Sequence, residues 1–249
     1  MLRLTAAAAL LAAFALPAAA QELRLGTEGA YAPWNFINDA GVVDGFEIEL
    51  GNAICERAGW TCTWVVNEWD SIIPNLVGGN YDAIMAGMSI TEERMLTIDF
   101  SQDYYPPDPS VFIMAGDASF DFGALSGVRI GVQGATIQAA YAEANFAASN
   151  TILAYETGDQ SVADLAAGNV DMVLADNGYL RPIAEASGGA FKIEGPEILI
   201  GGGVGVGLRK ADDELEATFN ATLDEMKADG SLDALIGKWF QVGPFYSQM

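Results

Sequence analysis

Short runs of aliphatic and β-branched residues alternate with longer helical stretches along the chain. The runs lie at 23–27 (LRLGT), 62–66 (CTWVV) and 82–86 (DAIMA), and helices are predicted near 47–58 and 71–78. Strands that alternate with helices are typical of an α/β fold, in which helices flank a sheet. We therefore predict an α/β protein.

Two of these segments have a counterpart later in the chain. LRLGTEGA at 23–30 resembles VRIGVQGA at 128–135, and LVGGNYDAIMAG at 76–87 resembles LAAGNVDMVLAD at 165–176. The second pair shares Leu, Gly, Asn, Asp and Ala at equal spacing. One such likeness can arise by chance between βα units, but two in the same order indicate two similar lobes.

Two β-rich segments connect the predicted lobes. DYYPPDPSVFIMA at 103–115 contains three prolines, which stiffen it, and EILIGGGVGVGLR at 197–209 contains glycines, which leave it permissive. The chain after this second segment is helical and is expected to pack back on the first lobe. We therefore predict lobe 1 from 21–107 plus 204–249, lobe 2 from 108–203, and a two-strand hinge.

The first 20 residues have the order of a secretory signal peptide: one arginine, an apolar stretch, then small residues. Cleavage after Ala20 would fit an A-x-A pattern and leave 229 of the 249 residues. No later apolar run approaches the roughly 18 to 20 residues that span a bilayer. We expect an exported, soluble protein.

Composition restricts the chemistry further. The sequence has no histidine, which excludes Ser-His nucleophilic catalysis and His-based zinc sites. Its two cysteines, Cys55 and Cys62, are too few for a metal site, but a disulfide can persist in an exported chain. Gly59 is a suitable C-cap for the first helix, so Cys55 near its end can meet Cys62 in the next strand. We expect no metal and no cofactor.

The chain is strongly acidic. Removal of the signal takes one of 11 basic residues and none of the 34 acidic ones, so the charge becomes about −24. Such a surface repels nucleic acid and anionic lipid. It either serves solubility, in a salty environment for example, or also attracts cationic solutes, and only the site residues can decide between these readings.

In open α/β sheets, ligands bind beyond the carboxyl ends of the strands. The predicted strand ends lead into 28–31, 86–89, 133–138 and Asp176. If the two lobes face each other, these segments line one cleft.

The chain resembles the periplasmic polar amino-acid-binding proteins of ABC transporters, in particular the lysine/arginine/ornithine, histidine and opine binders. The resemblance covers nearly the whole mature chain, in TEGAYAPWNF (27–36), DGFEIEL (44–50), WDSIIPNLVGGNYDAIMAGMSITEER (69–94), RIGVQGAT (129–136), LAAGNVDMVLAD (165–176) and GVGLRKADDEL (205–215). It implies a type II two-lobed periplasmic-binding-protein-like fold, each lobe a mixed sheet flanked by helices, which encloses an amino acid by hinge closure. It also implies a periplasmic monomer, permease subunits in the inner membrane as partners, and a lobe 1 disulfide between Cys55 and Cys62.

The resemblance assigns the ligand's α-carboxylate to Arg94, whose guanidinium can meet two carboxylate oxygens as a fork. Arg94 follows Ser89, which with Glu92 would form a capping box at a helix start. The alternatives are a surface arginine paired with Glu93 and, for Ser89, a purely capping role.

Across the cleft, the segment 134–138 would aim the backbone N–H groups of Thr136 and Ile137 at the same carboxylate, with Gln138 beside them. The family has GTT or GST here, whereas this chain has Ala135-Thr136-Ile137, so we expect backbone contacts at Ile137. The alternative is an ordinary helix start.

Asp176 matches the carboxylate that holds the ligand's α-ammonium in this family. Its alternative is a helix N-cap. Because the matching position in opine binders is often not acidic, Asp176 favours a free α-amino group. Gly87, where relatives often carry serine, lacks a hydroxyl but keeps a carbonyl for the ammonium.

Side-chain specificity is expected from Glu28, Glu47, Tyr31 and Trp69. The acids match residues, commonly aspartates, that meet the distal cation in lysine and arginine binders. The aromatic pair matches residues that sandwich the ligand stem, where cation–π attraction is worth roughly 0.5 to 2 kcal/mol. Ordinary core packing is the alternative for each aromatic ring.

These assignments predict a binder of a cationic amino acid such as arginine, lysine or ornithine. An opine, histidine or glutamine binder, or a sensory binding module, are the alternatives. A cyclohexadienyl dehydratase-like enzyme, with Glu28 or Glu47 as general acid, is disfavoured because its dicarboxylate substrate needs more cationic groups than Arg94.

Overall fold

The computed structural model describes residues 21–247, so the signal peptide predicted at 1–20 lies outside the described residues. The strands are β1 (Glu22–Thr27), β2 (Ala30–Tyr31), β3 (Asn35–Ile37), β4 (Val43–Asp44), β5 (Thr61–Val66), β6 (Ala83–Ile84), β7 (Asp99–Tyr105), β8 (Ser110–Ala115), β9 (Arg129–Gln133), β10 (Thr151–Tyr155), β11 (Met172–Asp176), β12 (Phe191–Ile193) and β13 (Val204–Leu208). The helices are α1 (Phe46–Ala58), α2 (Trp69–Val77), α3 (Glu92–Met95), α4 (Ile137–Phe146), α5 (Gly158–Ala166), α6 (Asn177–Ala186), α7 (Asp213–Ala228) and α8 (Ser231–Phe240). Within 21–247, no helix combines the length and hydropathy needed to cross a membrane.

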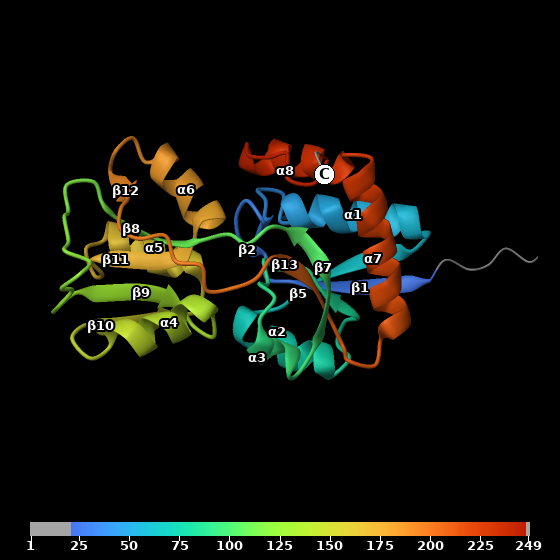
Figure 1. Ribbon diagram of the computed structural model, residues 1–249, viewed down its shortest axis with the longest axis horizontal. Coiled ribbons are helices and arrows are strands. Elements are labelled where there is room, and N and C mark those ends of the chain that lie inside the picture. Colours follow the sequence, from blue (N-terminus) through green and yellow to red (C-terminus); the bar gives the residue numbers. More distant parts are fainter. Residues whose placement is uncertain (1–20, 248–249) are drawn as a thin grey trace, which may run out of the picture.

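Two five-stranded sheets build two lobes (Figure 1). The sheet of lobe 1 has the order β5-β1-β6-β13-β7, and that of lobe 2 has the order β10-β9-β11-β8-β12. In each, the first three strands are parallel and the last two pair antiparallel with their neighbours. The predicted α/β fold with two lobes, each a mixed sheet flanked by helices, is confirmed.

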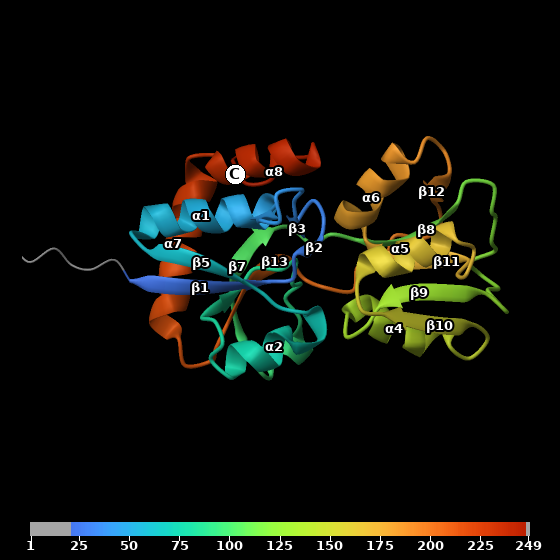
Figure 2. The same ribbon diagram turned by 180° about the vertical axis from the view of Figure 1, so that it is seen from behind.

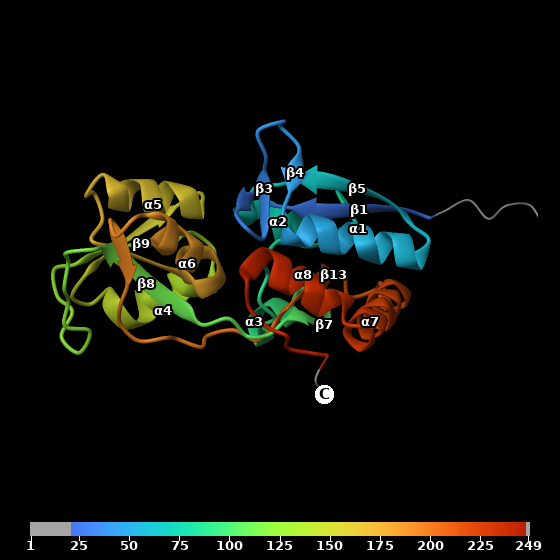
Figure 3. The same ribbon diagram turned by 90° about the horizontal axis from the view of Figure 1, so that it is seen from above.

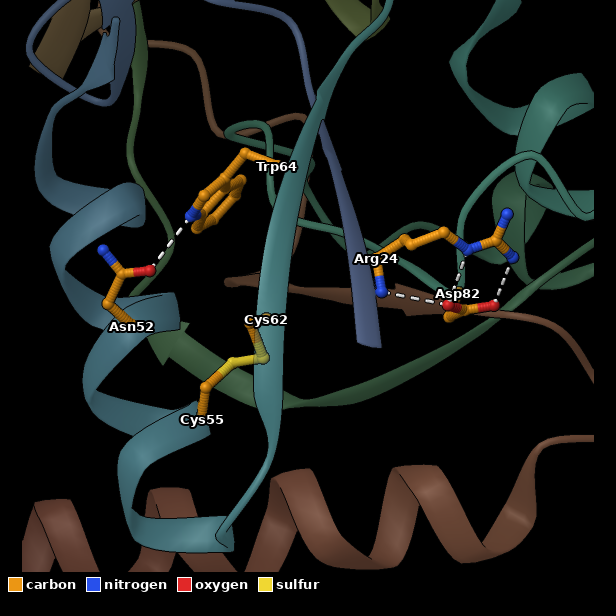
Figure 4. Close-up of a disulfide and its surroundings, with 6 residues drawn as sticks. All are labelled: Arg24, Asn52, Cys55, Cys62, Trp64 and Asp82. Atoms are coloured by element: carbon orange, nitrogen blue, oxygen red, sulfur yellow. Dashed lines mark hydrogen bonds and ion pairs between the residues drawn. A yellow bond between two sulfur atoms is a disulfide. The ribbon is translucent and has the colours of Figure 1, made fainter. Parts of the chain in front are cut away.

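The repeated segments occupy equivalent places in the two sheets. The orders β5-β1-β6 and β10-β9-β11 match, and the middle strand of each trio carries, within its first three residues, an arginine that pairs with an aspartate. Nη2 of Arg24 lies 2.8 Å from Oδ1 of Asp82, and Nη2 of Arg129 lies 2.6 Å from Oδ1 of Asp171. Figure 4 shows the first of these pairs. The repeat therefore includes an ion pair that ties the start of one strand to the turn before another.

The chain passes between the lobes twice, at 106–109 and 194–203, as Figures 1 and 2 show. Both crossings lie where proline-rich and glycine-rich segments were predicted to connect the lobes. The C-terminal helices α7 and α8 return to pack on α1 in lobe 1, which confirms their predicted position (Figure 3). The lobe boundaries themselves, at 107/108 and 203/204, stay a prediction.

The first helix ends as its sequence predicts. Gly59 caps α1 in the left-handed conformation at φ 69°, and the chain then turns directly into β5. Cys55 in the last turn of α1 is thereby joined to Cys62 in β5, with 6.1 Å between the Cα atoms (Figure 4). The predicted disulfide is confirmed.

We expect Cys55→Ser to lower the free energy of unfolding by about 2 kcal/mol, because the bond closes a short loop and restricts the unfolded chain. Urea denaturation monitored by circular dichroism measures this. A reductant should bring the wild-type midpoint to that of the variant and leave the variant unchanged. Equal midpoints of the oxidised and reduced wild type would contradict the prediction.

Candidate functional site

A cavity lies between the two lobes, at the carboxyl ends of their central strands. Its lining from lobe 1 comprises Glu28, Tyr31, Trp69, Ala86, Gly87, Ser89 and Arg94, and its lining from lobe 2 comprises Gln133, Thr136, Ile137, Gln138, Gly158, Ser161, Leu174, Ala175 and Asp176. The four predicted strand-end segments therefore meet in one place. Every residue predicted to contact the ligand lines this cavity except Glu47.

Arg94 is the one basic side chain that lines the cavity within the described chain. Its Nη1 donates to the backbone oxygen of Ser89 at 2.8 Å rather than pairing with the adjacent Glu93, and its Cζ lies 5.2 Å from the centre of the Trp69 ring. Burial lowers the pKa of Arg94 to about 10, so the guanidinium stays charged at neutral pH. It can hold an anion at this end of the cavity.

The capping box predicted between Ser89 and Glu92 is wrong. Ser89 is still extended and forms an antiparallel bridge with Val204, so the helix cannot begin there. Thr91 is the N-cap of α3 instead, and its Oγ1 accepts from the backbone N–H of Arg94 at 3.2 Å. Ser89 lines the cavity without capping the helix.

The start of α4 faces Arg94 from the other side of the cavity. Thr136 is the N-cap, and its Oγ1 accepts from the N–H of Ala139 at 3.0 Å and donates to the carbonyl of Gln133 at 2.7 Å. The predicted helix start is confirmed. Because the first backbone N–H groups of a helix lack intrahelical partners and carry partial positive charge, this end of the cavity suits a carboxylate.

Asp176 ends β11 and directs its carboxylate into the cavity. It occupies the N-cap position of α6, yet its side chain makes no capping hydrogen bond. Instead, Oδ2 accepts from the hydroxyl of Tyr31 at 2.9 Å and Oδ1 accepts from Nε2 of Gln138 at 2.6 Å. Burial raises the pKa of Asp176 to about 6, against the lowering effects of Tyr31 and Arg94. A cation beside this carboxylate would offset its desolvation.

Glu28 provides a second buried carboxylate in the cavity. It is 6% exposed, and its Oε1 accepts from Nε2 of Gln133, which also donates to the carbonyl of Glu156 at 3.1 Å. Burial raises the pKa of Glu28 to about 7, and the nearby acids Asp159, Glu47 and Asp70 raise it further, whereas Gln133 lowers it.

Gln133 lies in the predicted strand-end segment 133–138, but it was not among the residues to which a contact with the ligand was assigned. A signal for it exists in the repeat, where VRIGVQGA places Gln133 at the position that Glu28 holds in LRLGTEGA. The two equivalent residues meet across the cleft and bond to each other.

Glu47 lies behind the cavity wall, contrary to its expected role as a ligand-facing acid. Its Oε1 accepts from the N–H of Gly87 at 2.6 Å and from the hydroxyl of Tyr104, and its Oε2 accepts from Nδ2 of Asn35 at 2.7 Å. Both oxygens are thus used by protein donors in a fully buried position, where burial raises the pKa. Glu47 holds the turn at Gly87, whose φ of 62° favours glycine.

The two predicted aromatic residues line the cavity and also join the lobes. Nε1 of Trp69, the first residue of α2, donates to the carbonyl of Ala135 at 3.2 Å. The ring of Tyr31 stacks on that of Tyr179 from lobe 2. Both therefore do more than fill the core of one lobe.

Comparisons with known proteins agree with this geometry. Residues 23–242 match the family described as bacterial extracellular solute-binding proteins, family 3. The lysine/arginine/ornithine-binding periplasmic protein of Escherichia coli is 35% identical over 92% of this chain and 91% of its own length. The octopine-binding periplasmic protein of Rhizobium meliloti is 35% identical over 90% and 92%. A crystal structure of a periplasmic His/Glu/Gln/Arg/opine family-binding protein from Silicibacter pomeroyi in complex with lysine is 51% identical, with a TM-score of 0.82, and covers 90% of this chain and 100% of that one.

We expect Glu47→Gln to lower the free energy of unfolding by about 1 to 3 kcal/mol, because the new amide N–H₂ group faces buried donors. Glu49→Gln, on the same helix but half-buried at the surface and bonded to Lys238 and Trp239, is the matched control; its amide oxygen can still accept, so it should cost less than about 1 kcal/mol. Thermal and urea unfolding compare the two. Similar losses from both variants would show that Glu47 does not have this structural role.

Proposed function

The chain belongs to family 3 of the bacterial extracellular solute-binding proteins, and from that premise we propose that it captures an amino acid with a cationic side chain for an ABC importer. The observation that carries the proposal is the cavity, which pairs one anion-binding end with two carboxylates, the buried Glu28 and the half-buried Asp176. An amino acid with a positive side chain has the matching charges, one negative and two positive.

The α-groups of the ligand would bind to both lobes at once. Arg94 from lobe 1 and the start of α4 from lobe 2 would hold the α-carboxylate, with Ser89, Thr136 and Ile137 around it. Asp176 would hold the α-ammonium, aided by the carbonyl of Gly87. Because one small molecule contacts both lobes, binding would favour their closure.

The other end of the cavity favours a hydrogen-bond donor. Nε2 of Gln133 already donates to Glu28 and to the carbonyl of Glu156. The other polar atoms of these two side chains are the carboxylate oxygens of Glu28 and the amide oxygen of Gln133. As acceptors, they suit the ammonium of lysine or ornithine, or the guanidinium of arginine. The side-chain amide of glutamine would need a donor for its carbonyl oxygen and is therefore a poorer match. The named relatives that bind lysine, arginine or ornithine support this class.

A free α-amino group fits better than the substituted nitrogen of an opine. Each oxygen of Asp176 already accepts one hydrogen bond, from Tyr31 and from Gln138. A substituent on the nitrogen would remove a donor and add bulk between these side chains. The octopine binder among the relatives makes octopine the natural competitor to test.

The remaining parts of the proposal follow from the family. Residues 1–20 would direct export to the periplasm, the lobes at 21–107 plus 204–249 and at 108–203 would close on the ligand, and the closed monomer would deliver it to the permease subunits. The family and the named relatives are binding proteins, and this protein is not an enzyme.

Isothermal titration with arginine, lysine, ornithine, histidine, glutamine and octopine tests the proposal. The cationic amino acids should bind most tightly, and Arg94→Ala or Asp176→Ala should weaken them by at least about 100-fold, because each leaves a buried charge of the ligand unpaired. Arg57→Ala, which removes an exposed pair with Asp229, should bind like the wild type. Absence of heat with every amino acid would refute the proposal.

The pKa of Glu28, about 7, also predicts how binding depends on pH. The carboxyl is mostly ionised at pH 8 and mostly protonated at pH 5.5, so a cation can bind at pH 5.5 only if the proton leaves. We expect the affinity for lysine to fall by about 30-fold or more from pH 8 to pH 5.5, because the ionised fraction of Glu28 falls by about that factor. Glu28→Gln should bind more weakly at pH 8 and keep only the smaller fall contributed by Asp176, whose pKa is about 6. Titrations at both pH values decide, and a wild-type affinity that rises at pH 5.5 would contradict this.

A further inference from the structure

One aromatic contact joins the two lobes beside the cavity, and only one of its two rings lines the cavity. The rings of Tyr31 from lobe 1 and Tyr179 from lobe 2 are stacked, with centroids 4.2 Å apart and planes 13° from parallel. Both side chains are buried, at 7% and 1% exposure. Tyr31 lines the cavity, whereas Tyr179 does not, and its ring meets the cavity wall where it stacks on Tyr31.

Lobe 2 holds the Tyr179 ring in place from two sides. Its hydroxyl donates to Oδ1 of Asp159 at 2.7 Å. A Cβ atom at Gly158 would lie 3.0 Å from three atoms of the Tyr179 side chain, so the backbone at the start of α5 packs directly against the ring. The ring is therefore a rigid surface on which Tyr31 can settle when the lobes meet.

Tyr31 is held by lobe 2 at a second point. Its hydroxyl donates to Oδ2 of Asp176, the carboxylate proposed to bind the ligand's ammonium. The ring of Tyr31 therefore stacks on Tyr179, and its hydroxyl bonds to Asp176, which lies three residues before Tyr179 in the chain. These contacts form between protein groups alone, so they stabilise the closed arrangement before any ligand contributes.

We propose that Tyr179 is a positioning residue, which clasps the two lobes through Tyr31 and sets how long every bound ligand is retained. The inference rests on the proposed function for its effect on ligands. Because Tyr179 does not line the cavity, its loss should weaken all ligands by the same factor and leave their order of preference unchanged. Because the stack forms only on closure, the loss should appear in the dissociation rate.

Three variants separate the ring from the hydroxyl. Tyr179→Met keeps an apolar side chain of similar length and removes the flat ring, and it should raise Kd and the dissociation rate of lysine and arginine alike, by about three- to tenfold. Tyr179→Phe keeps the stack and loses only the bond to Asp159, and it should stay within about twofold of the wild type. Tyr141→Met, which removes a tyrosine of the same lobe that packs on Phe146, should not change Kd.

Stopped-flow fluorescence gives the rates, and thermal unfolding confirms that each variant is folded. A double-mutant cycle with Tyr31→Leu checks the pathway, since loss of Tyr179 should have little further effect once Tyr31 is gone. Equal Kd values for Tyr179→Met and the wild type, a change in ligand preference, or equal losses from Tyr179→Phe and Tyr179→Met would each overturn the proposal.

Small-angle X-ray scattering without ligand tests the clasp independently of what the protein binds. The radius of gyration of ligand-free Tyr179→Met should exceed that of the wild type, while Tyr179→Phe and Tyr141→Met should match it. Failure of every amino acid to bind the wild type would refute the proposed function and leave this measurement valid. An unchanged radius in Tyr179→Met would refute the clasp and leave the proposed function intact.

Discussion

Two carboxylates, the buried one of Glu28 and the half-buried one of Asp176, lie between the lobes, and Arg94 is the one cationic side chain among residues 21–247 that lines the same cavity. Ionised carboxylates lose hydration on burial, and this loss raises the pKa of both groups. The closed arrangement therefore lacks positive charge that a ligand can supply. We therefore expect closure of the lobes to be more favourable around a bound cation than without one.

The repeated βα segments explain why these groups converge. Glu28 and Gln133 hold equivalent positions in the repeat, and so do Gly87 and Asp176. All four line one cavity because the equivalent strand ends of the two lobes face each other. The two lobes share one scaffold and differ at these paired positions: lobe 1 has the acid Glu28 where lobe 2 has the amide Gln133, and lobe 2 has the acid Asp176 where lobe 1 has Gly87.

Contacts behind the cavity brace the strands that end in it. Arg24 with Asp82, and Arg129 with Asp171, tie the far ends of the central strands in the two lobes. Glu47 holds the turn at Gly87 through a buried hydrogen bond. The stack of Tyr31 on Tyr179, in contrast, joins a residue of one lobe to a residue of the other.

The sequence by itself determined the features that depend on neighbours along the chain. The alternation of strands and helices, the repeat, the cap at Gly59 and hence the disulfide all follow from local periodicity and turn chemistry. Strand ends also predicted ten of the sixteen cavity residues, because ligands bind where strands end in such sheets.

Only the tertiary structure decided what each polar side chain bonds to. The resemblance assigns Glu28 and Glu47 the same role, yet both oxygens of Glu47 accept hydrogen bonds behind the cavity wall, whereas Glu28 bonds to Gln133 and lines the cavity. Ser89 does not cap a helix because it pairs with Val204, and Tyr179 contacts Tyr31 from the opposite lobe. These partners lie far apart in the chain, and no local pattern encodes them, because a buried polar group takes whichever donor or acceptor the packed chain brings within reach.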